Sequence, residues 1–123
     1  MDKIELQRRT KTFHINVINL CFSFPRNAAA FEISKQIIRS AGSVGANCRA
    51  LARAKSTDDF INKVAIIIEE ADESLYWLEI IHEVKLIDKN PMIGNLIKEA
   101  NELTAIFVAI SKTTKARKAN HKS

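Results

Sequence analysis

The central stretch of the chain, residues 33–78, constrains the fold most, because it holds two amphipathic segments of different character. The first segment places small and polar residues where a plain core helix would carry bulky apolar ones. The second repeats apolar residues at steps of three and four, the spacing of one helix face. The small and polar set is Gln36, Arg39, Ser40, Ala41, Gly42, Ser43, Gly45, Ala46 and Asn47; the apolar set is Phe60, Val64, Ile67, Ile68, Ala71, Leu75 and Leu78. The combination predicts closely packed helices and assembly, and it identifies no reaction.

The length and the scarcity of turn residues predict a single helical domain. A chain of 123 residues can bury a core without disulfides or metals. Three Gly and two Pro residues are too few for the many turns of a β protein. The expected helices span about residues 3–22, 28–54, 57–87 and 91–111. We predict an all-α fold, an up-down-up-down left-handed four-helix bundle over residues 1–111, followed by a basic C-terminal tail, 112–123, that frays.

The first expected helix carries two apolar stripes. One stripe is Phe13, Val17, Leu20 and Phe24, and the other is Ile15, Ile18 and Phe22. A helix on the surface of a lone bundle needs only one stripe. Two stripes predict that this helix is covered on two sides, by its own bundle and by a neighbouring copy.

Charge is distributed unevenly along the chain. The net charge is +5, made up of +7 over residues 1–55, −7 over residues 56–111 and +5 over the tail. The basic first part and the acidic second part can attract each other within one subunit or between subunits.

Several classes of protein are disfavoured by the pattern. Cys21 and Cys48 lie inside apolar helical repeats, which favours reduced core cysteines. The start of the chain has two acids and no apolar core, so we expect no signal peptide. The apolar run at residues 64–68 is too short to span a bilayer. We expect a cytoplasmic protein with no membrane partner.

Motifs for catalysis, metals and cofactors are weak. Glu79 and His82 form one Glu-x-x-His step, whereas di-iron bundles use this step twice with further carboxylates. The glycines in residues 42–45 lie within a helical pattern and follow no strand, so they do not form a phosphate-binding loop. We predict a protein that is not an enzyme, with no catalytic residue, no metal and no cofactor.

The polar residues of the central segments have two interpretations. Gln36, Arg39, Ser43 and Asn47 recur at helical steps and share a face, and Glu70 and Glu73 can do likewise on the next helix. A binding pocket is one interpretation. A structural network, with Arg39 paired to Glu70 or Glu73, is favoured because buried charges persist only when they are paired.

Three basic clusters are the candidate nucleic-acid contacts. The clusters are Arg8, Arg9 and Lys11; Arg49, Arg53 and Lys55; and Lys115, Arg117 and Lys118. Phosphate contacts by such groups give non-specific affinity with a steep salt dependence. A solvated basic surface that keeps the protein soluble explains the same charges, and the sequence leaves both interpretations open.

The central segments also resemble a known family. The string QIIRSAGSVGAN at residues 36–47, the Ser-x-x-Asp-Phe step at 56–60 and EEADESLYWLEII at 69–81 resemble the 23S rRNA intervening-sequence proteins. The chain departs from that pattern at residues 49–51, where relatives commonly carry an acidic residue, so a role for that carboxylate is in doubt.

The resemblance implies several functional features. It implies a four-helix bundle that assembles into homopentamers, with no catalytic residue, encoded inside insertions in bacterial large-subunit ribosomal RNA genes. Its members are similar to the accessory protein of diversity-generating retroelements, a basic pentamer that engages nucleic acid and a reverse transcriptase. We therefore expect a non-catalytic homo-oligomer that contacts RNA or DNA. The alternative is an adaptor for a polymerase-like or reverse-transcriptase-like protein, without nucleic-acid affinity of its own.

Overall fold

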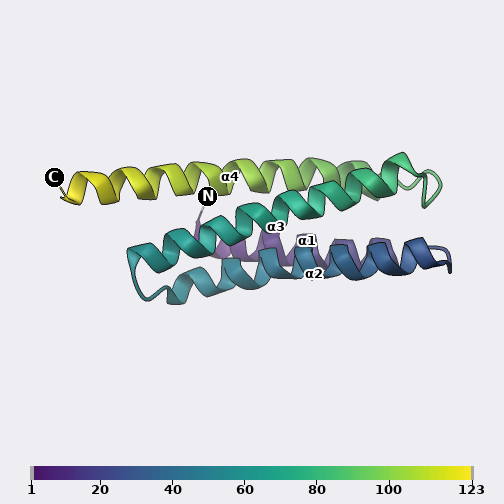
Figure 1. The fold of residues 1–123 in the computed structure, drawn as a ribbon, viewed down its shortest axis with the longest axis horizontal. Helices are drawn as coiled ribbons and strands as arrows, with labels where there is room; N and C mark the ends of the chain where they lie inside the picture. The colour runs from purple at the N-terminus through teal and green to yellow at the C-terminus, as the bar shows by residue number, and fades with distance from the viewer. Residues whose placement is uncertain (1, 123) are drawn as a thin grey trace.

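The computed structural model describes residues 2–122, and this part of the chain contains four α-helices and no strand. The helices are α1 (Lys3–Cys21), α2 (Ala28–Ala50), α3 (Thr57–Glu83) and α4 (Pro91–Lys122); a 3₁₀ turn, η1 (Leu51–Arg53), follows α2 (Figure 1). The predicted all-α four-helix bundle is confirmed. Its left-handed sense stays a prediction.

Each of the four helices begins at a capping side chain, which for α4 is Asn90, whose side-chain oxygen accepts a hydrogen bond from the Met92 backbone N–H at 2.9 Å. The carboxylate of Asp2 accepts a hydrogen bond from the Glu5 backbone N–H at 2.7 Å. Asn27 and Ser56 cap α2 and α3 in the same way, because each side chain accepts a backbone N–H three residues along, at 2.8 and 3.0 Å. These bonds satisfy donors that the first helical turn leaves without a partner.

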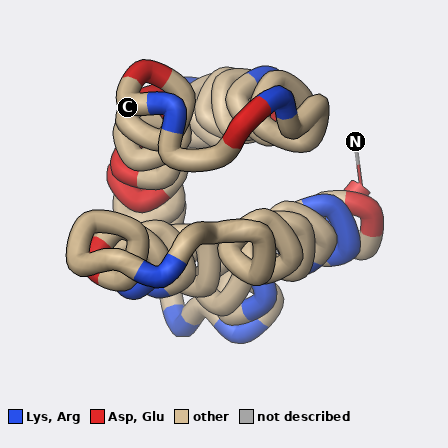
Figure 2. Tube along the Cα trace, turned by 90° about the vertical axis from the view of Figure 1, so that its right-hand side faces the viewer, with Lys and Arg blue, Asp and Glu red and all other residues tan. Residues whose placement is uncertain are grey.

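The helices pack in an up-down-up-down arrangement (Figure 1). Helix α2 lies between α1 and α3, and α4 packs mainly on α3 and closes the bundle against α1 over a smaller contact. Helices α1 and α3 are therefore diagonal to each other and run in the same direction. Seen along the bundle axis, Lys and Arg predominate on the α1–α2 pair (Figure 2).

Two helix ends differ from the predicted ones. Helix α3 ends at Glu83 rather than at residue 87, because Lys85 takes a left-handed backbone with φ of 54° and turns the chain. Helix α4 continues past Ser111 to Lys122. The tail lacks an apolar stripe, but alanine, lysine and arginine are strong helix formers. The fraying expected of the tail in solution stays a prediction.

The core is built from one apolar stripe of each helix. The largest fully buried side chains are Phe13, Val17, Leu20, Ile37, Val44, Val64, Ile67, Leu78, Ile81, Leu103 and Phe107. Three polar residues, Thr10, Ser40 and Ser74, are also fully buried, and each hydroxyl has a hydrogen-bond partner.

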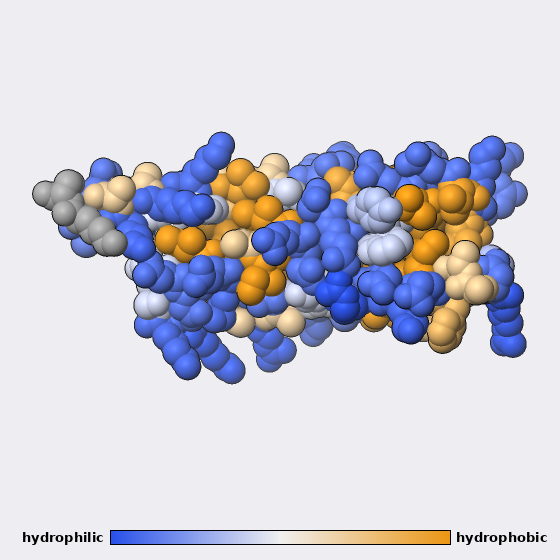
Figure 3. All heavy atoms as spheres, in the orientation of Figure 1, coloured by the Kyte–Doolittle hydropathy of each residue, from blue (hydrophilic) through white to orange (hydrophobic). Residues whose placement is uncertain are grey.

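The two stripes of α1 have different environments. Phe13, Val17 and Leu20 are buried in the core, whereas Ile15 is 46% exposed and Phe22 is 81% exposed. Hydrophobic side chains also reach the surface on the face shown in Figure 3, as two patches separated by a hydrophilic band. A single copy of the chain therefore leaves the second stripe of α1 uncovered.

The glycines of α2 do not have the same role. A Cβ atom added at Gly42 would lie 3.1 Å from Nε2 of His14, so α1 and α2 approach closely there. A Cβ atom at Gly45 would meet the Thr10 carbonyl oxygen at 3.5 Å, an ordinary contact. The close packing inferred from the two glycines is thus found at Gly42.

Both cysteines are free thiols. Cys48 is buried and Cys21 is half-buried. Burial raises the pKa of the Cys21 thiol to about 11 and also raises the pKa of Cys48. Because the thiolate is the reactive form, neither environment suits a nucleophile.

Candidate nucleic-acid interface

The basic clusters at the end of α2 and in the tail, which are far apart in the sequence, lie towards the same end of the bundle, whereas the α1 cluster lies farther along the axis, level with Glu99 and Glu102 of α4. This end is where α1 and α3 begin and where α2 and α4 finish (Figure 1). The alternating direction of the helices produces this convergence, because it places the start of each odd helix beside the finish of each even one.

The convergence polarises the charge of the whole molecule. Residues 2–11, 46–66 and 108–121 contain twelve Lys and Arg against four Asp and Glu, a net charge of +8. Residues 12–45 and 67–107 contain six basic and ten acidic residues, a net charge of −4. A polyanion would be attracted to the first end and repelled by the rest of the molecule.

Two of the predicted nucleic-acid contacts, Arg9 and Lys118, form ion pairs between helices of the bundle. The Arg9 guanidinium donates to both carboxylate oxygens of Glu99, at 2.6 and 2.7 Å, and to Glu102 at 2.7 Å. These carboxylates raise the pKa of Arg9, chiefly through the hydrogen bond that Arg9 donates to Glu99. Lys118 pairs with Asp58 at the start of α3. Arg9 therefore links α1 to α4, and Lys118 links α4 to α3, so neither side chain is a candidate contact for a ligand.

The other predicted basic residues face solvent. Among the described residues, none of them has a carboxylate within 4 Å of its side-chain nitrogen atoms; they are Arg8, Lys11, Arg49, Arg53, Lys55, Lys115 and Arg117. Arg49 and Arg53 line a hollow of about 380 Å³ together with Gln7 of α1 and Lys63 of α3. The remaining lining residues are Ala46, Ala50 and Ala52, whose short side chains leave the guanidinium groups accessible to a phosphate.

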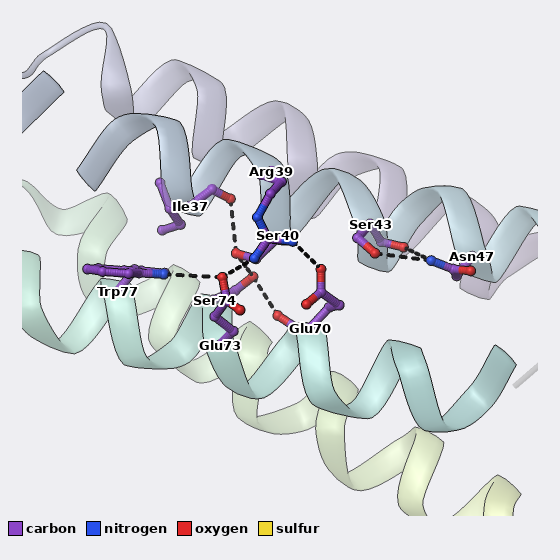
Figure 4. Close-up of polar contacts among 9 residues, drawn as sticks. All are labelled: Ile37, Arg39, Ser40, Ser43, Asn47, Glu70, Glu73, Ser74 and Trp77. Atoms are coloured by element: carbon purple, nitrogen blue, oxygen red, sulfur yellow. Dashed lines mark hydrogen bonds and ion pairs between the residues drawn. The ribbon is translucent and has the colours of Figure 1, made fainter. Parts of the chain in front are cut away.

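The predicted polar network is confirmed only at its centre. Arg39 donates to Glu70 at 2.9 Å and also to Glu73, so it pairs with both candidates and joins α2 to α3 (Figure 4). Hydrogen bonding to Glu73, and then to Glu70, raises the pKa of Arg39. The indole Nε1–H of Trp77 donates to Glu73 at 3.4 Å.

The outer members of that network bond within their own helix. The Gln36 amide donates to Glu32 at 3.1 Å, and the Asn47 amide donates to the Ser43 carbonyl and hydroxyl at 2.9 and 3.0 Å. Sequence reasoning missed the buried contact between Ser40 and Ser74, whose hydroxyl oxygens are 2.8 Å apart. The available signal was Ser74, a small polar residue at a core position of the apolar repeat in α3.

We expect Arg39→Leu to lower the free energy of unfolding by about 1 kcal/mol, since Arg39 is 52% exposed and solvent weakens its ion pairs. Retention of RNA should not change, because the guanidinium is committed to Glu70 and Glu73. Urea denaturation and filter binding of the same preparation measure the two quantities. Lys98→Leu, which removes a solvent-facing cation of α4, is the control. Lost RNA retention with unchanged stability would instead make Arg39 a ligand contact.

The described residues provide neither a metal-binding cluster nor a membrane-spanning helix. No three His, Cys, Asp or Glu side chains gather as they would around a metal ion, and His82 is exposed. No described helix is long and apolar enough to cross a membrane.

The fold and this charged end define a small helical-bundle protein with its basic groups segregated along the axis. The chain belongs to the 23S rRNA-intervening sequence protein family, whose model matches residues 2–109. It is similar to the crystal structure of a protein with unknown function from the S23 ribosomal protein family of Bacteroides thetaiotaomicron. The two share 32% sequence identity with a TM-score of 0.79, over 87% of this chain and 98% of that chain. No curated protein matches the chain.

Proposed function

We propose that this protein is a non-catalytic cytoplasmic homo-oligomer, assembled as a pentamer, that contacts RNA or DNA through the basic ends of its bundles. The observation that carries the proposal is the convergence of chain-distant basic clusters at one end, with arginines that have no carboxylate partner among residues 2–121. Residues Arg49, Arg53, Lys55, Lys115 and Arg117 are the proposed phosphate contacts. Arginine suits this role because its planar guanidinium can bond two phosphate oxygens at once.

Assembly would strengthen a weak contact. One bundle end offers only a few phosphate contacts, which alone give modest non-specific affinity. Copies held side by side would present the same basic end several times, so that each further contact forms at a high effective concentration. The exposed apolar side chains of α1 and α3 support association, because a solitary bundle leaves them in water.

The test is a filter-binding titration of mixed RNA over a range of salt concentrations. The wild-type protein should bind at low salt and lose affinity steeply as salt rises. The double variant Arg49→Ala/Arg53→Ala should bind about tenfold more weakly. Its salt slope should fall by about 1.4 if each arginine contacts one phosphate of a single strand.

A matched control removes the same charge elsewhere. The double variant Arg26→Ala/Lys98→Ala also loses two exposed cations, both outside the basic end, and should bind like the wild type. No RNA retention at low salt would overturn the nucleic-acid proposal and favour the adaptor function. Equal losses in both variants would show a response to net charge alone, and would reject the basic end as the site.

A further inference from the structure

Almost all of the large apolar side chains that the bundle exposes lie along two lines. The outer face of α1 carries Ile4, Ile15 and Phe22, and the outer face of α3 carries Ile66, Tyr76 and Val84. These six are between 41% and 81% exposed, and the only other large exposed apolar residue in the described chain is Phe31 of α2. We call the two lines the α1 seam and the α3 seam; Phe22 and Val84 are the C-cap residues of their helices.

Charged residues occupy the same place in both seams, with opposite sign. In the α1 seam, Arg8 and Lys11 lie between Ile4 and Ile15. In the α3 seam, Glu69 and Glu73 lie between Ile66 and Tyr76. In each seam the last apolar residue lies eighteen positions after the first, which is about five helical turns. Along each seam the side chains are therefore apolar, then charged, then apolar. The charged residues are cations in the α1 seam and anions in the α3 seam.

We propose that the α1 seam of one copy packs in parallel against the α3 seam of the next copy. This interface rests on the proposed homo-oligomer and specifies how it forms. Parallel docking places Ile4 by Ile66, Ile15 by Tyr76 and Phe22 by Val84. It also sets Arg8 against Glu69, and Lys11 against Glu73, which in its own chain already pairs with Arg39, so that apolar surface meets apolar surface and the cations of α1 meet the carboxylates of α3.

The antiparallel alternative does not fit. With one helix reversed, Ile4 would still meet Val84 and Phe22 would meet Ile66. The cations of α1 would then lie against Tyr76 and Ile80, and the carboxylates of α3 against Ile15 and Ile18. Burying charges against apolar side chains without a partner is costly, so the charge pattern selects the parallel orientation.

The register of the bundle indicates that such contacts close into a ring. Gly45 lies beside Thr10 of α1, and Ser40 contacts Ser74 of α3. Moving five residues along antiparallel α2 and α3, from Ser40 and Ser74, brings Gly45 level with Glu69. Thr10 and Glu69 of one chain are then at about the same height along the bundle, and pairing Arg8 with Glu69 of the next copy needs little axial shift.

The two seams lie on diagonal helices, so each copy offers one seam to each of two neighbours. A contact between two different surfaces forms a ring when repeated rotation closes without a rise. All basic ends then lie on one side of that ring, as multivalent binding to a polyanion requires. The same arrangement commits Arg8 and Lys11 to assembly instead of to RNA.

The decisive experiment uses one variant for each seam and a mixture of the two. Ile15→Asp/Phe22→Asp disables the α1 seam, and Ile66→Asp/Tyr76→Asp disables the α3 seam. Size-exclusion chromatography with light scattering should give the 13.8 kDa chain mass for each variant alone. An equimolar mixture should give twice that mass and no more, because one intact seam of each kind remains. Phe31→Asp, an exposed aromatic away from both seams, should keep the wild-type mass.

A gentler variant pair guards against misfolding. Arg8→Glu or Glu69→Arg alone should weaken association about tenfold, and the two changes in one chain should restore it, because each interface takes one residue from each copy. Circular dichroism checks that the helices persist. Unchanged mass in the seam variants, or no dimer in the mixture of folded variants, would overturn the interface while leaving an oligomer in place. A monomeric wild type would overturn the proposed assembly itself.

Discussion

Replacing Phe107 by alanine should lower the free energy of unfolding by about 3–5 kcal/mol. Phe107 is fully buried on the inner face of α4, within the single core that all four helices share. Truncation removes apolar contacts and leaves a cavity that the surrounding close-packed side chains fill only in part. Urea denaturation followed by circular dichroism measures the loss, at one fixed protein concentration because association and folding are coupled.

The matched control for Phe107 is the same truncation at the surface. Phe31 is 67% exposed on the first turn of α2, so Phe31→Ala should change the free energy of unfolding by less than about 1 kcal/mol. Similar losses at the two positions would mean that Phe107 does not lie in a packed core. The packing of the inner face of α4 against the other helices would then be wrong.

The second large effect is expected at the buried contact between Ser40 of α2 and Ser74 of α3. Ser40 and Ser74 are fully buried, and their hydroxyl oxygens are 2.8 Å apart. Ser74→Leu inserts a branched side chain into this space and forces the helices apart, which should cost about 3 kcal/mol. The melting temperature and the urea midpoint should both fall.

Ser74→Ala separates packing from hydrogen bonding at this site. Alanine removes the hydroxyl without adding volume, and Ser40 keeps a hydrogen bond to the Ile37 carbonyl at 3.2 Å. The expected loss is about 1 kcal/mol. If leucine were tolerated as well as alanine, the two helices could not be packed as closely as these hydroxyls indicate.

The helices and much of the core could be predicted from sequence because both depend on local pattern. The apolar repeat of α3 and the capping residues Asn27 and Ser56 act within one or two turns, and the predicted helix starts at 28 and 57 are confirmed. The continuation of α4 past residue 111 could not be predicted from an apolar stripe, because the tail has none and its helix depends on the helix propensity of its lysine, arginine and alanine residues. The end of α3 could not be predicted because its left-handed residue is Lys85 and not glycine, the usual residue in that conformation.

The candidate site could be predicted only in part, because pairing across helices depends on their register. That basic clusters meet at one end follows from the alternating direction of the helices. The direction of the helices does not reveal which cations already form ion pairs. Arg9 pairs with Glu99, ninety residues away, whereas its neighbour Arg8 is exposed to solvent. Gln36 and Asn47 likewise share a face with Arg39, but each finds a partner within its own helix.

The exposed second stripe of α1 connects the sequence, the fold and the proposed function. In the sequence it is a second set of apolar residues on one helix. In a single bundle Ile15 and Phe22 of this stripe remain exposed to water, and they match the apolar residues of the α3 seam. The hydrophobic effect favours removing such surface from water, and opposite charges at equivalent positions favour doing so between copies.

The most direct measurement is the mass of the purified wild-type protein in dilute solution, by light scattering at micromolar concentration. We predict a discrete assembly of five copies of the 13.8 kDa chain. A stable, folded species of 13.8 kDa that does not associate as its concentration is raised would contradict the account, because the seams would then be permanently exposed to water.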